Sequence, residues 1–197
     1  MKRFMVSTCL AATVFMTTGT AMADSIKGKL GVTGKIGLLV PADNESDFYH
    51  NKTDAGLTGS VGLLYGVDDH IAAELEVSRT SFSSENGDFG MTDVSLSGQY
   101  RFANLRRQLV PYLGGGLDIL VSNYDPYDGT LRNVDTTLGA HINGGFDYFL
   151  QKELALTAEV NVVVAPNANI TDGLGDHRGN FDPTNFSTTV GVRYFFN

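Results

Sequence analysis

The 197-residue sequence lacks several features that define common classes of protein. It has no tryptophan and a single cysteine, Cys9, so no disulfide bond can form within one chain. It contains no run of about 20 apolar residues, which excludes a bundle of membrane-spanning helices. Only 18% of the residues are charged and the formal net charge is −8, which argues against nucleic-acid binding. The hydrophobic content of 42% is nevertheless too high for a disordered chain.

The start of the chain has the features of a cleaved export signal. The positively charged residues Lys2 and Arg3 precede a short apolar stretch, and an Ala-Met-Ala cleavage site ends at Ala23. The apolar stretch is too short to act as a membrane anchor. We therefore expect a signal peptide over residues 1–23 and a single domain over residues 24–197.

Apolar and polar residues alternate through most of the domain with the period of a β-strand. Between Leu30 and Val40, most apolar residues fall at even positions, with lysine and threonine among the residues at odd positions. A strand places these two sets on opposite faces. Seven further segments alternate in the same way: residues 57–67, 71–77, 94–102, 113–121, 138–148, 154–164 and 186–196.

The connections between these segments are alternately short and long. Short connections are expected near residues 68–69, 103–108 and 149–152, and long polar ones near 41–54, 83–90, 123–133 and 166–184. This pattern predicts an all-β fold, an eight-stranded antiparallel up-and-down transmembrane β-barrel with short periplasmic turns and longer extracellular loops. A soluble sandwich or lipocalin-like barrel is the alternative, and the export signal together with aromatic residues at the strand ends favours the bacterial outer membrane.

Aromatic residues recur where the predicted strands reach the periplasmic rim. Tyrosine and phenylalanine rings favour the membrane interface, so they predict one aromatic girdle. The predicted membrane-interface aromatics are Tyr65, Tyr100, Phe102, Tyr148, Tyr194 and Phe196.

The face opposite the apolar one carries charges in nearly every segment. Eight strands enclose an interior just wide enough for side chains, so these charges predict a polar plug in the lumen. The plug comprises Lys35, Glu74, Glu76, Arg101, Asp118, His141, Glu159 and Arg193, and Asp93 and Asp147 share its face. Placing Asp93 opposite Thr80 predicts an ion pair between Arg101 and Glu74.

Four apolar residues break the polar pattern of the inward face near the outer ends of ascending strands. These residues are Leu39, Phe82, Leu120 and Val163. They predict an apolar collar above the plug, suited to a hydrophobic solute. Alternatively, β-bulges near the strand ends turn these side chains outward. Residues 114–116, all glycine, mark either a weak wall for sideways exit or room for bulky neighbours.

The sequence offers no arrangement typical of an enzyme or a metal site. The four histidines are scattered without metal-ligand spacing. Glu74 and Glu76 share a face, but neutralisation by cations in a filled lumen explains them better than acid–base catalysis. We expect no catalytic residue, no metal and no cofactor, and interpret the acidic stretches 125–128 and 172–176 as solvated loops.

Four stretches resemble known outer-membrane barrels. Alternating apolar residues from Val190 to Phe196 resemble the C-terminal assembly signal of such barrels, although Asn197 follows them. Residues 110–117 (VPYLGGGL), 145–154 (GFDYFLQKEL) and 181–195 are similar to the OmpW family of small eight-stranded barrels, and more broadly to OmpA/OmpX-type barrels.

The resemblance implies a monomer with a narrow lumen that passes or binds small, largely hydrophobic compounds. It also implies contact with outer-membrane lipid and lipopolysaccharide, and recognition of the C-terminal strand by the barrel-assembly machinery. The alternative function is a non-transporting, adhesin-type barrel that acts through its extracellular loops.

Overall fold

The structure is a computed structural model. It describes residues 25–41, 44–46, 49–51, 55–84, 87–103, 108–126, 132–172 and 177–196. The predicted signal peptide, including its cleavage near Ala23, lies outside these residues. Within the described ranges, no helix is long and apolar enough to cross a membrane.

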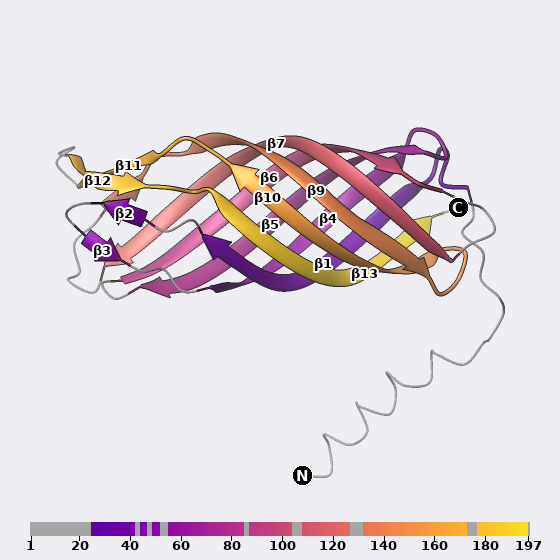
Figure 1. The fold of residues 1–197 in the computed structure, drawn as a ribbon, viewed down its shortest axis with the longest axis horizontal. Helices are drawn as coiled ribbons and strands as arrows, with labels where there is room; N and C mark the ends of the chain where they lie inside the picture. The colour runs from indigo at the N-terminus through magenta and orange to yellow at the C-terminus, as the bar shows by residue number, and fades with distance from the viewer. Residues whose placement is uncertain are drawn as a thin grey trace, which may run out of the picture.

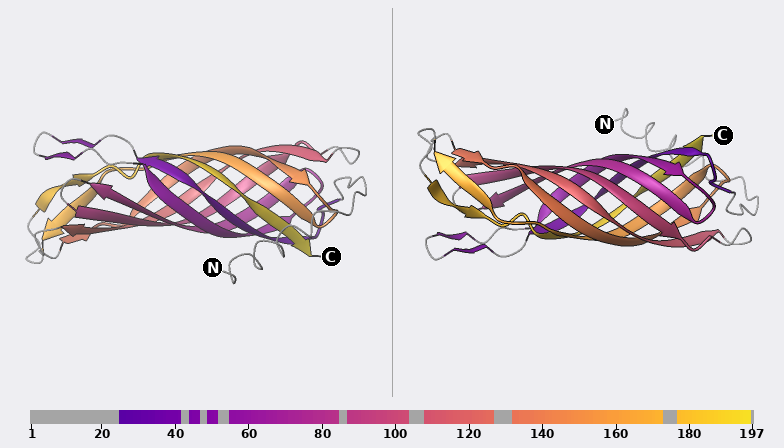
Figure 2. Two further views of the ribbon diagram at one scale, coloured as in Figure 1. Left: turned by 90° about the horizontal axis from the view of Figure 1, so that it is seen from below. Right: turned by 90° about the horizontal axis from the view of Figure 1, so that it is seen from above.

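Eight long strands form a closed antiparallel barrel (Figure 1). They are β1 (Leu30–Pro41), β4 (Gly56–Gly66), β5 (Ile71–Ser84), β6 (Gly87–Arg101), β7 (Leu109–Pro126), β9 (Thr137–Phe149), β10 (Leu154–Val164) and β13 (Asn185–Phe196). Each pairs with the next long strand in the sequence, and β13 closes the barrel on β1 with Leu30 opposite Phe196. Figure 2 shows this closed wall from two further sides. The predicted fold class is confirmed.

Five short strands extend the long-loop end of the barrel. They are β2 (Asn44–Ser46), β3 (Tyr49–Asn51), β8 (Arg132–Val134), β11 (Ala168–Asp172) and β12 (His177–Phe181). β11 pairs with both β8 and β12, so these three strands continue the main sheet, whereas β2 and β3 form a separate hairpin. Figure 1 shows β2, β3, β11 and β12 at the end opposite the C-terminus.

The prediction of a long loop over residues 83–90 is wrong. β5 and β6 remain paired as far as Ser84 and Gly87, so only two residues connect them. The serine, aspartate and glycine residues of this stretch suggest a loop, but the register of a hairpin carries the backbone pairing onward from the strands that precede it.

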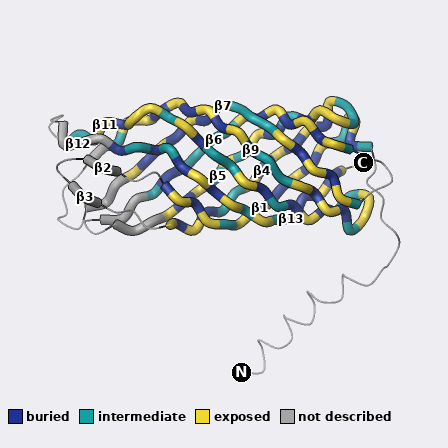
Figure 3. The backbone as a smooth tube through the Cα atoms, in the orientation of Figure 1, coloured by how far each residue is buried: buried dark blue, intermediate teal, exposed yellow. Residues whose placement is uncertain are grey.

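Burial largely alternates along the described parts of the long strands, as Figure 3 shows. Outward residues such as Leu117, Leu138 and Ile142 are about 70% exposed (70%, 71% and 69%), whereas the inward charged residues are mostly buried. A soluble protein would bury the apolar set, so this inverted arrangement is that of a barrel whose outer face contacts lipid.

The lumen is filled in three layers. At the short-turn end, a buried periplasmic cluster consists of Ile26, Leu64, Ala72, Val110, Phe149, Ala155 and Phe195. The rings of Phe149 and Phe195 stack there at a centroid distance of 5.8 Å. At the long-loop end, a buried outer cluster consists of Leu39, Met91, Leu120, Val163, Ala168 and Phe181. An ionic layer, formed by the charged inward residues, lies between the two.

Candidate functional site

Arg193 lies in the innermost part of the ionic layer, nearest the periplasmic cluster. Its side chain is fully buried and donates hydrogen bonds to both carboxylate oxygens of Glu74, at 2.9 and 3.0 Å, and to Thr33 Oγ1 at 2.9 Å. It also donates to Asp147 Oδ2 at 2.7 Å. Arg101 donates to the same Asp147 oxygen at 2.5 Å, so two guanidinium groups share this carboxylate. Charge-assisted bonds of this kind offset the cost of burying the charges.

The predicted ion pair between Arg101 and Glu74 is therefore wrong. Thr80 lies opposite Met91 rather than Asp93, so the register differs by two residues from the expected one. Arg101 is consequently placed beyond Ile71, with its backbone N–H bonded to the carbonyl of His70 at 2.6 Å.

Tyr112 connects the two arginines with the rest of the layer. The guanidinium carbons of Arg101 and Arg193 lie 5.6 and 5.7 Å from its ring centroid, within the range of a cation–π contact. Its hydroxyl donates to Glu159 Oε2 at 2.9 Å. Tyr112 is not among the predicted plug residues, although its inward parity on β7 is a signal in the sequence that identifies it.

Lys35 neutralises the middle of the ionic layer. Its ammonium lies 2.6 Å from Glu76 Oε2 and 2.8 Å from Glu159 Oε1. Asn143 also donates to Glu159, at 3.1 Å. Nearer the outer end, His141 Nδ1 lies 2.8 Å from Asp118 Oδ1. The structure thus places all eight predicted plug residues inside the barrel.

Three of the four predicted collar residues lie together in the outer cluster. Leu39, Leu120 and Val163 are at most 5% exposed and point inward. The pairings of β1, β7 and β10 along these residues show no register shift, so bulges do not turn them outward. The side chain of Phe82 lies outside the described part of the structure.

The apolar lining does not extend around the whole lumen. On β4 and β5, at the same level, the buried Thr80 hydroxyl donates to Thr58 Oγ1 at 2.9 Å. The outer strands cover the remaining side, because Ala168 of β11 and Phe181 of β12 are buried in the cluster. Val134 of β8, which lies opposite Ile170 of β11, packs against it.

The glycines of β7 make room for lumen side chains. A Cβ atom on Gly114 would lie 2.3 Å from Asn143 Oδ1, and one on Gly116 would lie 2.8 Å from His141 Cε1. β7 is paired without interruption to β6 on one side and to β9 on the other. Gly114 and Gly116 thus leave room for lumen side chains, as the alternative interpretation states, and the sideways exit at residues 114–116 stays a prediction.

The predicted interface aromatics all point outward near the periplasmic rim and are 40–51% exposed. Two pairs make edge-to-face contacts, Tyr100 with Phe102 at 5.1 Å and Tyr194 with Phe196 at 5.2 Å.

Just beyond the membrane, Asp68 accepts hydrogen bonds from the backbone N–H groups of His70 and Ile71, which hold the pKa of its carboxyl below the usual range.

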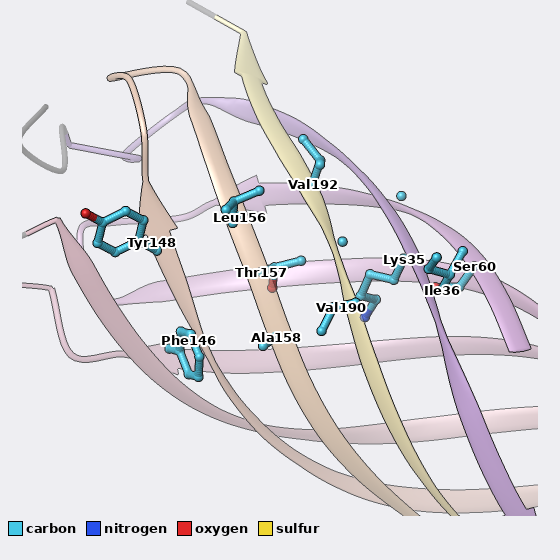
Figure 4. Close-up of a pocket in the computed structure, with 12 residues that line it drawn as sticks. Lys35, Ile36, Ser60, Phe146, Tyr148, Leu156, Thr157, Ala158, Val190 and Val192 are labelled. Carbon is cyan, nitrogen blue, oxygen red and sulfur yellow. The ribbon is translucent and has the colours of Figure 1, made fainter. Parts of the chain in front are cut away.

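The lipid-facing surface of β9, β10, β13 and β1 has a hollow of about 730 Å³ (Figure 4). Its lining includes Ala158 together with the larger residues Phe146, Leu156 and Val190. Because the lining is almost entirely apolar and faces the membrane, the hollow suits a lipid chain.

Among the described residues, no group of three or more His, Cys, Asp or Glu side chains is arranged to hold a metal ion.

Comparisons with known proteins agree with this architecture. OprG from Pseudomonas aeruginosa superposes with a TM-score of 0.71 at 15% identity, over 90% of this chain and 99% of OprG. Neisserial surface protein A superposes with a TM-score of 0.64 at 15% identity, over 88% of this chain and 99% of its own. AlkL in DMPC lipid bilayers superposes with a TM-score of 0.59 at 18% identity, over 92% of this chain and 96% of AlkL. At these identities the likeness shows the fold alone.

No curated protein matches the chain in sequence. The sequence model described as the outer membrane protein beta-barrel domain matches residues 7–194, nearly the entire length. The chain therefore belongs to the outer membrane protein beta-barrel domain family and is a protein of the bacterial outer membrane.

Proposed function

We propose that the barrel is an OmpW-like protein that holds small, largely hydrophobic compounds in a pocket at the outer end of its lumen. The observation that carries this proposal is the outer cluster, in which Leu39, Leu120 and Val163 replace the charges found deeper in the barrel. An apolar lining with few polar groups is the usual character of a small-molecule site.

The filling of the lumen supports a pocket rather than a continuous open channel. A solute that moved deeper would meet Lys35 and Glu159, and then the Arg193 network. Passing these groups without compensating bonds would cost several kcal/mol. The stacked rings of Phe149 and Phe195 obstruct the periplasmic end.

Access to the pocket requires movement of the outer strands, because Phe181 occupies the cluster. Val134 and Ile170 are Cα partners on β8 and β11, so a disulfide between cysteines at these positions would hold the cover in place. We expect the oxidised Val134→Cys/Ile170→Cys variant to lose binding of 1-octanol and the reduced variant to recover it. Equal binding in both states would contradict this route of access.

The pocket itself is tested by Leu120→Asn, which places an amide in the apolar lining. We expect it to weaken 1-octanol binding, measured by calorimetry in lipid nanodiscs with protein-free nanodiscs subtracted. Val163→Thr, which is nearly isosteric, should have a similar but smaller effect. The control Glu159→Gln, in the ionic layer below, should change binding much less. If only the Glu159 variant alters binding, solutes contact the ionic layer and the pocket is misplaced.

An alternative function through the extracellular surface is favoured by one observation. β8, β11 and β12 continue the main sheet beyond the barrel, which gives the outer end a paired surface that a partner could recognise. Cell attachment that is lost on deletion of residues 168–181, with no binding of 1-octanol by the intact protein, would favour this adhesin-type function.

The proposal also covers export and assembly of the chain. We expect the signal peptide to be cleaved after Ala23 and the barrel-assembly machinery to recognise β13. We further expect the barrel to be a monomer that contacts lipopolysaccharide. Mass spectrometry of the protein from purified outer membranes tests the cleavage site directly, because an N-terminus at Asp24 is expected.

A further inference from the structure

The balance of charge changes along the lumen. In the innermost part of the ionic layer, two arginines neutralise Glu74 and Asp147. In the middle, the single cation Lys35 forms ion pairs with both Glu76 and Glu159. Closest to the outer cluster, Asp93 and Asp118 have only His141 nearby, and it contacts Asp118. Among the described lumen residues, the deficit of positive charge is therefore largest directly beneath the outer cluster.

The two aspartates lie close together on the inner face of neighbouring strands. Asp118 of β7 is the Cα partner of Ser95 of β6, and Asp93 is the next inward residue of β6. This makes Asp93 and Asp118 diagonal neighbours, with side chains that can reach a common group. Asp93 is also the direct partner of Leu120, so the carboxylates adjoin the apolar lining.

Each aspartate has a buried carboxylate oxygen without a partner. Asp93 Oδ1 and Asp118 Oδ2 accept no hydrogen bond from any described residue, and Asp118 is only 1% exposed. A buried carboxylate without a donor is costly, more so beside a second one. These two carboxylate oxygens therefore lack a positively charged hydrogen-bond donor.

We propose that Asp93 and Asp118 bind the ammonium group of an amphiphilic amine whose apolar chain lies against the outer cluster. This inference rests on the proposed function and names its class of ligand. The ammonium donates hydrogen bonds to Asp93 Oδ1 and Asp118 Oδ2 and supplies the missing charge. Leu39, Leu120 and Val163 contact the chain, which takes the place of Phe181.

A matched pair of probes separates the contribution of the ammonium from that of the chain. Octylamine and 1-octanol have the same alkyl length and differ in charge, and their binding to the full barrel in nanodiscs is measured by calorimetry. We expect octylamine to bind about tenfold or more tightly than 1-octanol, as an additional charge-assisted hydrogen bond implies.

Substitution of each aspartate tests whether the two carboxylates cause the difference in affinity between octylamine and 1-octanol. Asp93→Asn and Asp118→Asn should each lower octylamine affinity about tenfold and leave 1-octanol affinity unchanged. Asp93→Glu keeps the charge and should preserve most of the preference. The matched control is Asp68→Asn, which removes a carboxylate from the turn between β4 and β5, at the opposite end of the barrel, and should change the binding of neither probe.

The outcomes distinguish the inference from the proposed function. If both probes bind equally and the asparagine variants bind like wild type, the pocket exists but the ammonium site does not. If the asparagine variants weaken both probes to the same extent, the aspartates only maintain the lumen, and the inference is again overturned. If neither probe binds, the proposed function itself fails.

Discussion

At the scale of single residues, Arg193 has the strongest influence on the ionic layer. It bonds to Glu74, Asp147 and Thr33 while fully buried. We expect Arg193→Met to lower the free energy of unfolding by about 3–5 kcal/mol, because two carboxylates lose their shared cation. Urea titration in lipid vesicles measures this change. Lys152→Met, in an exposed turn, is the control, and an Arg193 variant as stable as this control would contradict the role given to the network.

Glycine spacing allows the large lumen side chains to fit. A Cβ atom on Gly145 would lie 2.3 Å from the carbonyl oxygen of Ala158 and 2.7 Å from the Tyr112 hydroxyl, whereas one on Gly98 would have no atom within 4 Å. Gly145→Ala should therefore destabilise the barrel by about 1–3 kcal/mol. Gly98→Ala should be neutral or slightly stabilising. Urea-unfolding midpoints of the two variants in one lipid provide the comparison, and equal effects would show that the close contacts with Ala158 and Tyr112 do not require glycine at residue 145.

At the scale of the strand, the depth of an outward residue in the membrane determines how much free energy of unfolding is lost when a charged side chain replaces it. Leu117 lies outward near the middle of β7, so Leu117→Arg should cost about 2–4 kcal/mol of unfolding free energy. Leu156→Arg should cost less, because Leu156 lies opposite Tyr148 of the aromatic girdle. Leu117→Met controls for the change in shape. A Leu117→Arg variant as stable as the Leu117→Met control would place this face away from lipid.

Strand identity was readable from the sequence because a period of two fixes which side chains share a face. That rule correctly places Lys35, Glu159 and Arg193 in the lumen. It does not fix the register between strands, and the two-residue difference between β5 and β6 gives Arg101 a different partner from the one expected. Pairing depends on contacts across strands, which one strand's pattern does not contain.

The outer cluster was only partly predictable for a related reason. Leu39, Leu120 and Val163 belong to long periodic strands, so their parity reveals them. Ala168 and Phe181 lie in short strands of five residues, where alternation is too brief to read and the segment resembles a polar loop. The covering of the outer cluster by β11 and β12 therefore emerges only from the three-dimensional arrangement.

At the scale of the whole molecule, the outside is apolar and the inside is charged. We expect such a chain to have no stable folded state in water, because its exposed leucine, valine and isoleucine side chains favour contact with lipid. We expect the protein without its first 23 residues to fold in detergent micelles or lipid and to migrate differently on gels before and after heating. In plain buffer it should aggregate. A monodisperse, folded species in plain buffer, seen by circular dichroism and light scattering, would refute the membrane assignment.

The central claim is that the lumen holds a pocket above a filled interior, not a continuous water pore. Planar-bilayer recording of the refolded protein tests it most directly. Because the ionic layer and the periplasmic cluster fill the lumen, we expect no steady ohmic conductance above that of the bare bilayer. Stable, reproducible current steps that persist in the oxidised Val134→Cys/Ile170→Cys variant would contradict this claim, since they would require a water-filled path through the layers described as closed.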